Sequence, residues 1–126
     1  MKNNSLKFVL IKSLTVICLI LFFSYMALRI WFKSEINHIC QNAQENYQGD
    51  KIEALITLIT SPNENMETKN HAIWALGKLQ DTRALPKLKN LLTNEPCDHK
   101  HYVCQRELSK AIENLEGKSV DILKFK

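Results

Sequence analysis

Residues 14–28 read LTVICLILFFSYMAL and contain no charged side chain. They form the centre of an apolar run from Phe8 to Phe32, which is interrupted by Lys12, a few serine and threonine residues, and Arg29. A helix of roughly 20–25 residues is long enough to cross the hydrocarbon core of a bilayer, which is about 30 Å thick. The run therefore predicts an N-terminal transmembrane helix, anchored by the side chains of Leu14, Leu19, Leu21, Phe22, Phe23 and Trp31.

A short basic segment precedes this run, as it does in a cleaved signal peptide, so cleavage remains an alternative to an uncleaved signal-anchor. The run is longer than the apolar region of a signal peptide, which has about 7–15 residues. A cut after Ala27 would place Tyr25 where a small side chain is required. Trp31 and Phe32 suit the interface between membrane and water, which also favours the uncleaved anchor.

The charges that flank the run predict its orientation. Lys2, Lys7 and Lys12 lie before its apolar centre, whereas Arg29 and Lys33 lie after it. The positive excess on the N-terminal side favours a cytoplasmic N-terminus. The remainder of the chain would then lie outside the cytoplasm, and in a bacterium the membrane would be the inner membrane.

The net charge of the whole chain, +4, is misleading for its C-terminal part. Every charged residue before residue 34 is basic, whereas from Ser34 onward 12 basic residues face 13 acidic ones. A part of the chain with a net charge of −1 has no overall positive field for a phosphate backbone. Nucleic acid is therefore not an expected partner.

The rest of the chain predicts only helices. Residues 34–47 have an apolar face of Ile36, Ile39, Cys40 and Ala43, and this amphipathic helix either continues the membrane helix or begins anew. Apolar spacing and capping signals predict four more helices, over about 50–60, 66–79, 83–92 and 102–115. No segment has the pattern of a strand set, so the predicted fold is all-α. The predicted parts are a membrane anchor at 1–33, a juxtamembrane helix at 34–49, a repeat domain at 50–117 and a tail at 118–126.

Two local signals support these helices. Asp50 and Glu53 have the spacing of a capping box, in which each side chain accepts a hydrogen bond from the backbone of the other residue. Gly77 lies within a predicted helix, where glycine costs roughly 1 kcal/mol relative to alanine. We therefore expect another helix to cross closely at Gly77.

The four helices form two similar pairs. Leu55 and Leu58 align with Leu85 and Leu88, at an offset of 30 residues. The apolar face of the second helix aligns with that of the fourth at an offset of 36, which places an insertion between the third and fourth helices. This pattern predicts two αα-hairpin repeats. Their predicted core consists of Leu55, Leu58, Ala72, Ala75, Leu76, Leu79, Leu85, Leu88, Leu108, Ala111, Ile112 and Leu115.

Residues 70–88 read NHAIWALGKLQDTRALPKL and resemble the short HEAT repeats of the phycobilisome-lyase type. In that family a helix ending A-x-x-A-L-G-x-L is followed by a D-x-R-A-x-x-x-L turn and helix. The resemblance implies a right-handed stack of αα-hairpins, a short solenoid, with a protein-binding or scaffolding role. It does not imply bilin chemistry. Two hairpins are few for such a stack. The juxtamembrane helix can cap one end and the C-terminal tail the other, or a second copy or a partner can extend the stack, so association is an expectation to test.

Residues 97–104, CDHKHYVC, coincide with the insertion and are the one dense set of reactive side chains. A disulfide between Cys97 and Cys104 is the favoured interpretation, since such bonds persist in an oxidising compartment. A zinc or copper site formed by Cys97, His99, His101 and Cys104 is an alternative, although the ligands are crowded into eight residues. Two unbonded thiols are the third possibility.

Motifs for catalysis are missing from the sequence. It has no glycine-rich phosphate loop, no H-E-x-x-H and no G-x-S-x-G. We therefore expect no catalytic residues and no cofactor, and a membrane-anchored interaction or scaffold module that is not an enzyme. The alternatives are a metal-handling envelope protein that uses the 97–104 loop, and an anchor subunit of a larger membrane complex.

Overall fold

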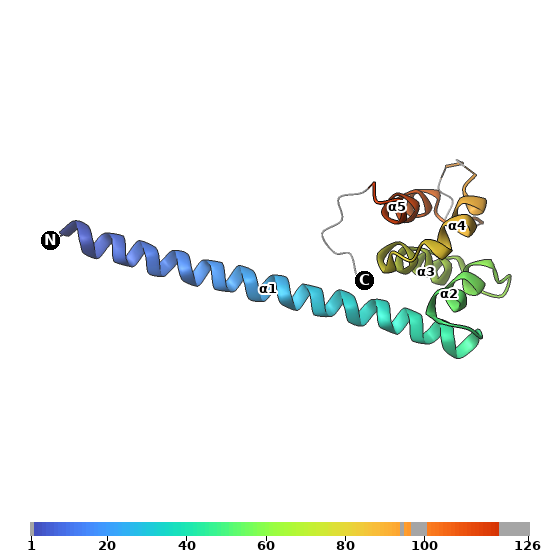
Figure 1. Ribbon diagram of the computed structural model, residues 1–126, viewed down its shortest axis with the longest axis horizontal. Helices are drawn as coiled ribbons and strands as arrows, with labels where there is room; N and C mark the ends of the chain where they lie inside the picture. The colour runs from blue at the N-terminus through green and yellow to red at the C-terminus, as the bar shows by residue number, and fades with distance from the viewer. Residues whose placement is uncertain (1, 94, 97–100, 119–126) are drawn as a thin grey trace. The chain divides into compact units, whose positions relative to one another are not determined.

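A computed structural model describes residues 2–93, 95–96 and 101–118 of the chain, and every regular element within them is helical. The chain divides into two compact units, Met1–Ser34 and Glu35–Lys126. The first helix, α1 (Lys2–Asn46), extends through this boundary (Figure 1). Residues 34–46 therefore continue the N-terminal helix and do not begin a new one.

The part of α1 in the first unit is apolar and exposed. Its large apolar side chains from Phe8 to Trp31 are 41–67% exposed. The predicted anchoring side chains, Leu14, Leu19, Leu21, Phe22, Phe23 and Trp31, are all in this exposed set. Among the described residues, α1 is the one helix long and apolar enough to cross a membrane.

Helix α2 (Lys51–Thr60) begins with the predicted capping box. Asp50 Oδ1 accepts hydrogen bonds from the backbone amides of Ile52 and Glu53, at 2.9 and 3.0 Å. Glu53 Oε2 accepts one from the Asp50 amide at 3.3 Å. These bonds satisfy amides that have no partner within the helix, and the capping box is confirmed. The helix ends before Pro62, because the residue that precedes a proline disfavours the α conformation.

Helix α3 (Met66–Leu79) has the predicted bounds and is capped by Asn65. The segment predicted as one helix at 83–92 has two parts, a 3₁₀ turn η1 (Thr82–Ala84) followed by α4 (Leu85–Leu91). A short 3₁₀ turn is common at the beginning of an α-helix.

Helix α5 (Gln105–Leu115) begins three residues later than the predicted start at Tyr102, so that prediction is wrong. Cys104 is the N-cap and has an extended backbone. Its amide donates a hydrogen bond of 2.8 Å to Asn70 Oδ1 on α3. A contact with a distant residue therefore sets where α5 begins. The helix ends before Gly117, whose φ of 73° favours glycine.

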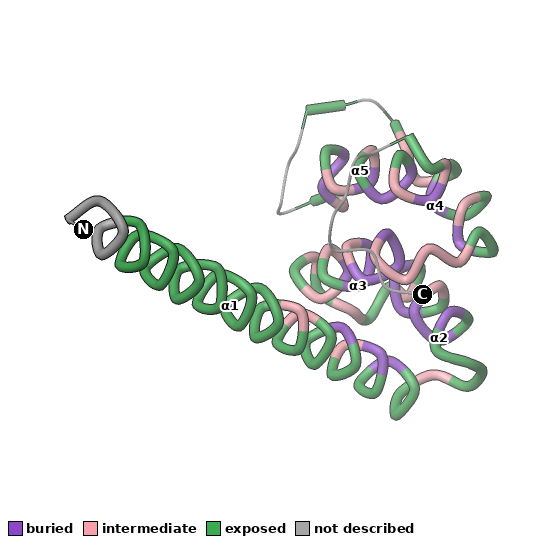
Figure 2. The backbone as a smooth tube through the Cα atoms, turned by 60° about the vertical axis from the view of Figure 1, so that its left-hand side comes forward, coloured by how far each residue is buried: buried purple, intermediate pink, exposed green. Residues whose placement is uncertain are grey.

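The second unit is built from two helical hairpins. Helix α3 lies between α2 and α5 and contacts both, while α4 contacts α5 and η1 (Figure 1). Buried positions occur on α2 to α5 and on the last turns of α1 (Figure 2). Ile36, Cys40 and Ala43 of α1 belong to this core.

Helices α3 and α5 approach each other closely at Gly77. A Cβ atom added there would lie 2.8 Å from the Ala111 Cα and 3.0 Å from its Cβ. The expected close crossing at Gly77 is therefore confirmed. The small residue permits the two hairpins to pack together, which explains why glycine is present despite its low helix propensity.

Candidate binding groove

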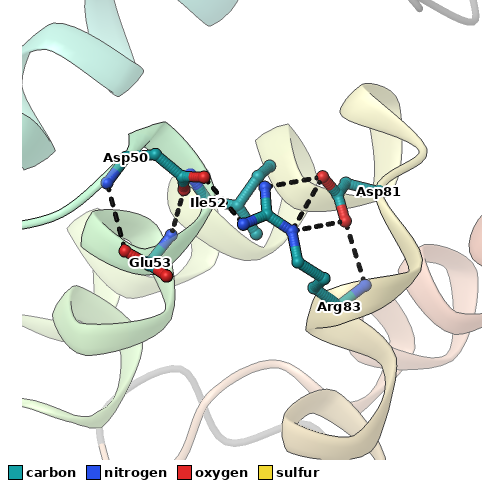
Figure 3. A network of polar contacts seen from close by, with 5 residues as sticks. All are labelled: Asp50, Ile52, Glu53, Asp81 and Arg83. Atoms are coloured by element: carbon teal, nitrogen blue, oxygen red, sulfur yellow. Dashed lines mark hydrogen bonds and ion pairs between the residues drawn. The ribbon is translucent and has the colours of Figure 1, made fainter.

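A polar cluster of Asp50, Asp81 and Arg83 joins the two hairpins, and each of the three side chains has a charged partner. The Arg83 guanidinium lies between Asp50 and Asp81 (Figure 3). Its Nη1 donates to Asp50 Oδ2 at 2.7 Å and its Nη2 to Asp81 Oδ2 at 2.8 Å. The amide of Glu53 and the Arg83 guanidinium lower the pKa of Asp50, and Arg83 also lowers the pKa of Asp81. Each carboxylate is paired and caps a helix, so the cluster has a structural role.

The candidate site is an open groove of about 430 Å³ in the second unit. It lies where α2 and α4 end and where α3 and α5 begin, so its walls come from both hairpins. Its volume is within the range of small-molecule binding sites, roughly 300–1,000 Å³. Its described lining consists of Ile59, Thr60, Met66, Lys69, Lys87, Asn90, Leu91, Thr93, His101, Tyr102, Val103 and Gln105.

Lys69 is the most unusual residue in this lining. It is 8% exposed, and the structure gives its ammonium no hydrogen-bond or ion-pair partner among the described residues. In the described part of the chain, every side-chain nitrogen or oxygen that is fully buried has a hydrogen bond. Because the Lys69 ammonium has none, it is not fully buried. The Lys69 stem is therefore buried while its ammonium keeps contact with solvent, as long basic side chains commonly do.

Two side chains fix the wall of the groove formed by residues 101–105. Gln105 is 6% exposed, and its Oε1 accepts a hydrogen bond from the Thr93 amide at 2.8 Å. Its Nε2 donates to the carbonyl oxygens of Leu91 and Val103, at 3.3 and 3.2 Å. Together with the bond from the Cys104 amide to Asn70, these contacts join the end of α4, the beginning of α5 and the middle of α3.

The predicted cysteine and histidine site is only partly within the described residues. Cys97 and His99 lie outside them, His101 is exposed, and Cys104 is buried at 1% exposure. No disulfide is found among the described residues, so the Cys97–Cys104 bond is not supported and stays a prediction. The described residues contain no group of three or more metal-binding side chains. The zinc or copper alternative also stays a prediction.

Cys40 is 5% exposed in the core at the end of α1. Burial raises the pKa of its thiol, and the charge of Lys51 offsets part of this effect. A thiolate is therefore disfavoured at Cys40, which limits its reactivity.

A second, smaller pocket of about 230 Å³ lies between the end of α1, α2 and α3. Its lining includes His38 and His71, which are far apart in the sequence, together with Glu35. Sequence reasoning missed this pair because each histidine stands alone among polar neighbours on its own helix. Both histidines are exposed.

The residues predicted as the repeat core lie on the inner faces of the hairpins. Leu79 and Leu85 are half-buried, and the other ten are at most 8% exposed. Sequence reasoning missed Lys69, although one signal was present. Lys69 precedes Ala72, Ile73 and Leu76 at helical spacing, so its place on the buried stripe of α3 could have been recognised.

A family model for the PBS lyase HEAT-like repeat matches residues 70–94. The match covers most of α3, all of η1 and α4, and the turn between them, including Asp81 and Arg83. Searches of curated proteins and of solved structures gave no match. The match supports a HEAT-like repeat in this part of the chain. Of the residues that line the groove, the matched range includes Lys87, Asn90, Leu91 and Thr93.

Proposed function

We propose that this chain is a membrane-anchored, non-catalytic protein-interaction module with a short HEAT-like solenoid. The observation that carries the proposal is the match of residues 70–94 to a HEAT-like repeat. Such repeats stack into extended surfaces that bind other proteins. The exposed apolar part of α1 supports the anchor, because an unpartnered apolar helix of this length is stable in a bilayer.

The proposal includes an orientation. The basic residues before the apolar centre of α1 support a cytoplasmic N-terminus, with the helical unit on the other side of the membrane. In a bacterium this arrangement places the chain in the inner membrane. Fusing a reporter that is active on only one side of the membrane to the C-terminus tests this assignment.

The binding surface in this proposal is the groove and the adjoining faces of α3 and α5. Its walls come from both hairpins, and its rim at residues 101–103 belongs to the insertion that interrupts the repeat. A short stack exposes its ends, which supports association with a partner or a second copy. No cofactor and no nucleic acid are part of the proposal.

An anchor exchange tests the proposed function. Residues 1–33 are replaced by an unrelated single membrane span, and the proteins that co-purify with the chain are quantified against the natural chain. A binding module retains its co-purifying proteins, because the second unit carries the interaction. Loss of these proteins with the second unit still folded would assign the specificity to α1 and make the chain an anchor subunit.

A further inference from the structure

The described lining of the groove carries positive charge, in contrast to the near-neutral balance of the chain from Ser34 onward. Residues from Ser34 onward have 12 basic and 13 acidic side chains, yet no described residue lining the groove is acidic. Lys69 and Lys87 both line it, and neither has an ion-pair partner among the described residues. A concave site with like charges and low-dielectric walls concentrates the electric field, which favours an anionic ligand.

The position of Lys69 strengthens this preference. Only 8% of the residue is exposed because its stem is packed in the groove, while its ammonium keeps contact with solvent. The packed stem holds the ammonium in the groove, so a ligand that pairs with it orders little further side chain. A ligand carboxylate can pair with this ammonium, and a hydrogen bond between two charged groups is stronger than one between neutral groups.

The rest of the lining indicates that the ligand also has apolar parts. Ile59, Met66, Leu91 and Val103 contribute apolar surface next to the two lysines. Tyr102 is 55% exposed, and in the described part of the chain it is the one large apolar side chain outside α1 that is so exposed. Exposed aromatic side chains beside a pocket are typical anchors of protein interfaces.

We propose that the groove binds an acidic peptide segment of a partner protein, in which an aspartate or glutamate lies beside an apolar residue. The carboxylate pairs with Lys69, Lys87 adds a second charge at the rim, and the apolar side chain packs against Tyr102 and the apolar lining. This inference rests on the proposed function, since it names the kind of partner that the interaction module binds. An anionic lipid also has apolar parts, but its acyl chains stay in the bilayer when its headgroup is bound, so apolar lining beside the two lysines favours the peptide.

A peptide selection tests this proposal. A random-sequence peptide library displayed on phage is selected on the full chain in nanodiscs, after subtraction on empty nanodiscs. The affinities of the selected peptides are then measured for the natural chain and for Lys69→Met, Lys87→Met and Lys51→Met. Lys51 is an exposed lysine that does not line the groove, so its variant is the matched control for loss of one positive charge. Thermal unfolding of each variant checks that it is folded.

The proposal predicts selected peptides that are enriched in aspartate or glutamate beside leucine or an aromatic residue. Their binding becomes roughly tenfold weaker or more with Lys69→Met, because a hydrogen bond between charged groups is lost. Lys87→Met weakens binding less, and Lys51→Met leaves it unchanged. Replacing the acidic residue of the peptide by its amide has the same effect as Lys69→Met. If Lys69→Met does not fold, two measurements still test the proposal. They are the affinity of the selected peptides for Lys87→Met, whose lysine is exposed, and the affinity of the amide peptides for the natural chain.

Three results would overturn the proposal. The first is that no peptide is enriched above empty nanodiscs, and the second is that the selected peptides bind equally well as amides. The third is Lys69-dependent binding to phosphatidylglycerol vesicles with no acidic peptide selected, which would assign the groove to lipid. If co-purifying proteins survive the anchor exchange but acidic peptides do not bind, the inference fails and the proposed function stands. If nothing co-purifies with the second unit, the proposed function itself fails.

Discussion

Arg83 Nη1 lies 2.7 Å from Asp50 Oδ2, although the two residues are 33 positions apart in the chain. Asp50 caps α2, whereas Arg83 belongs to the turn that precedes α4, so this contact joins the beginnings of the first helices of both hairpins. The same guanidinium binds Asp81, which caps η1. One planar side chain with several donors can bridge two carboxylates in this way, and lysine cannot.

Replacing Arg83 by lysine should therefore lower the free energy of unfolding, because the compact ammonium cannot hold both carboxylates in the same geometry. Chemical denaturation of the full chain in detergent measures the change. Arg106→Lys is the matched control, since the Arg106 side chain on α5 is 73% exposed. Equal changes for the two variants would contradict a bridging role for Arg83.

Gly77→Ala provides a test in which two effects have opposite signs. Alanine raises helix propensity by about 1 kcal/mol, but its Cβ would lie 2.8 Å from the Ala111 Cα. Overpacking of this kind costs about 1–3 kcal/mol, so we expect net destabilisation in a denaturation curve. The double variant with Ala111→Gly should recover part of the loss. A stabilised Gly77→Ala chain would show that α3 and α5 do not cross closely there.

Glu116 predicts a dependence of stability on pH. Hydrogen bonds from Lys118 and Lys89 lower its pKa from 4.5 to about 2. A carboxylate with a lowered pKa in the folded chain stabilises that chain above the pKa of the unfolded state. The contribution should therefore be present above about pH 4.5 and disappear as the pH falls towards 2.

The comparison with Glu116→Gln isolates this contribution, because glutamine does not titrate. The difference in free energy of unfolding between the two chains should be constant above pH 4.5 and shrink in more acidic solution. A difference that is the same at all pH values would show that the two lysines do not hold the Glu116 carboxylate in the folded chain.

The redox state of Cys97 and Cys104 tests the predicted compartment. An extracytoplasmic helical unit predicts that the two thiols are joined, so they should react with an alkylating reagent only after reduction. Mass spectrometry of the digested chain, taken from its native membrane, reads this out, and elemental analysis of the same sample detects zinc or copper. Unbonded thiols without metal would place the unit in the cytoplasm. Unbonded thiols with bound metal would favour the metal-handling alternative.

The helices were predictable wherever their signals are local. Asp50 and Glu53 define the beginning of α2 by contacts within four residues of sequence, and α3 has the bounds that its spacing predicts. The beginning of α5 was not predictable, because it depends on a hydrogen bond to Asn70, 34 residues earlier. The groove was missed because it too depends on contacts between residues that are far apart in the sequence. Its lining comes from four helices and one loop, and the importance of Lys69 emerges only when its neighbours are placed around it.

The central claim is that the groove binds a protein segment while the chain is held in its membrane. Site-specific photocrosslinking tests it most directly, with a photoreactive residue in place of Tyr102 in the full chain and in its native membrane. Lys110 on α5, whose side chain is 60% exposed and does not line the groove, is the control position. We predict a light-dependent adduct with another protein from position 102, none from position 110, and loss of the adduct with Lys69→Met. Equal adducts from both positions, no adduct from position 102, or an adduct that persists with Lys69→Met would contradict the claim.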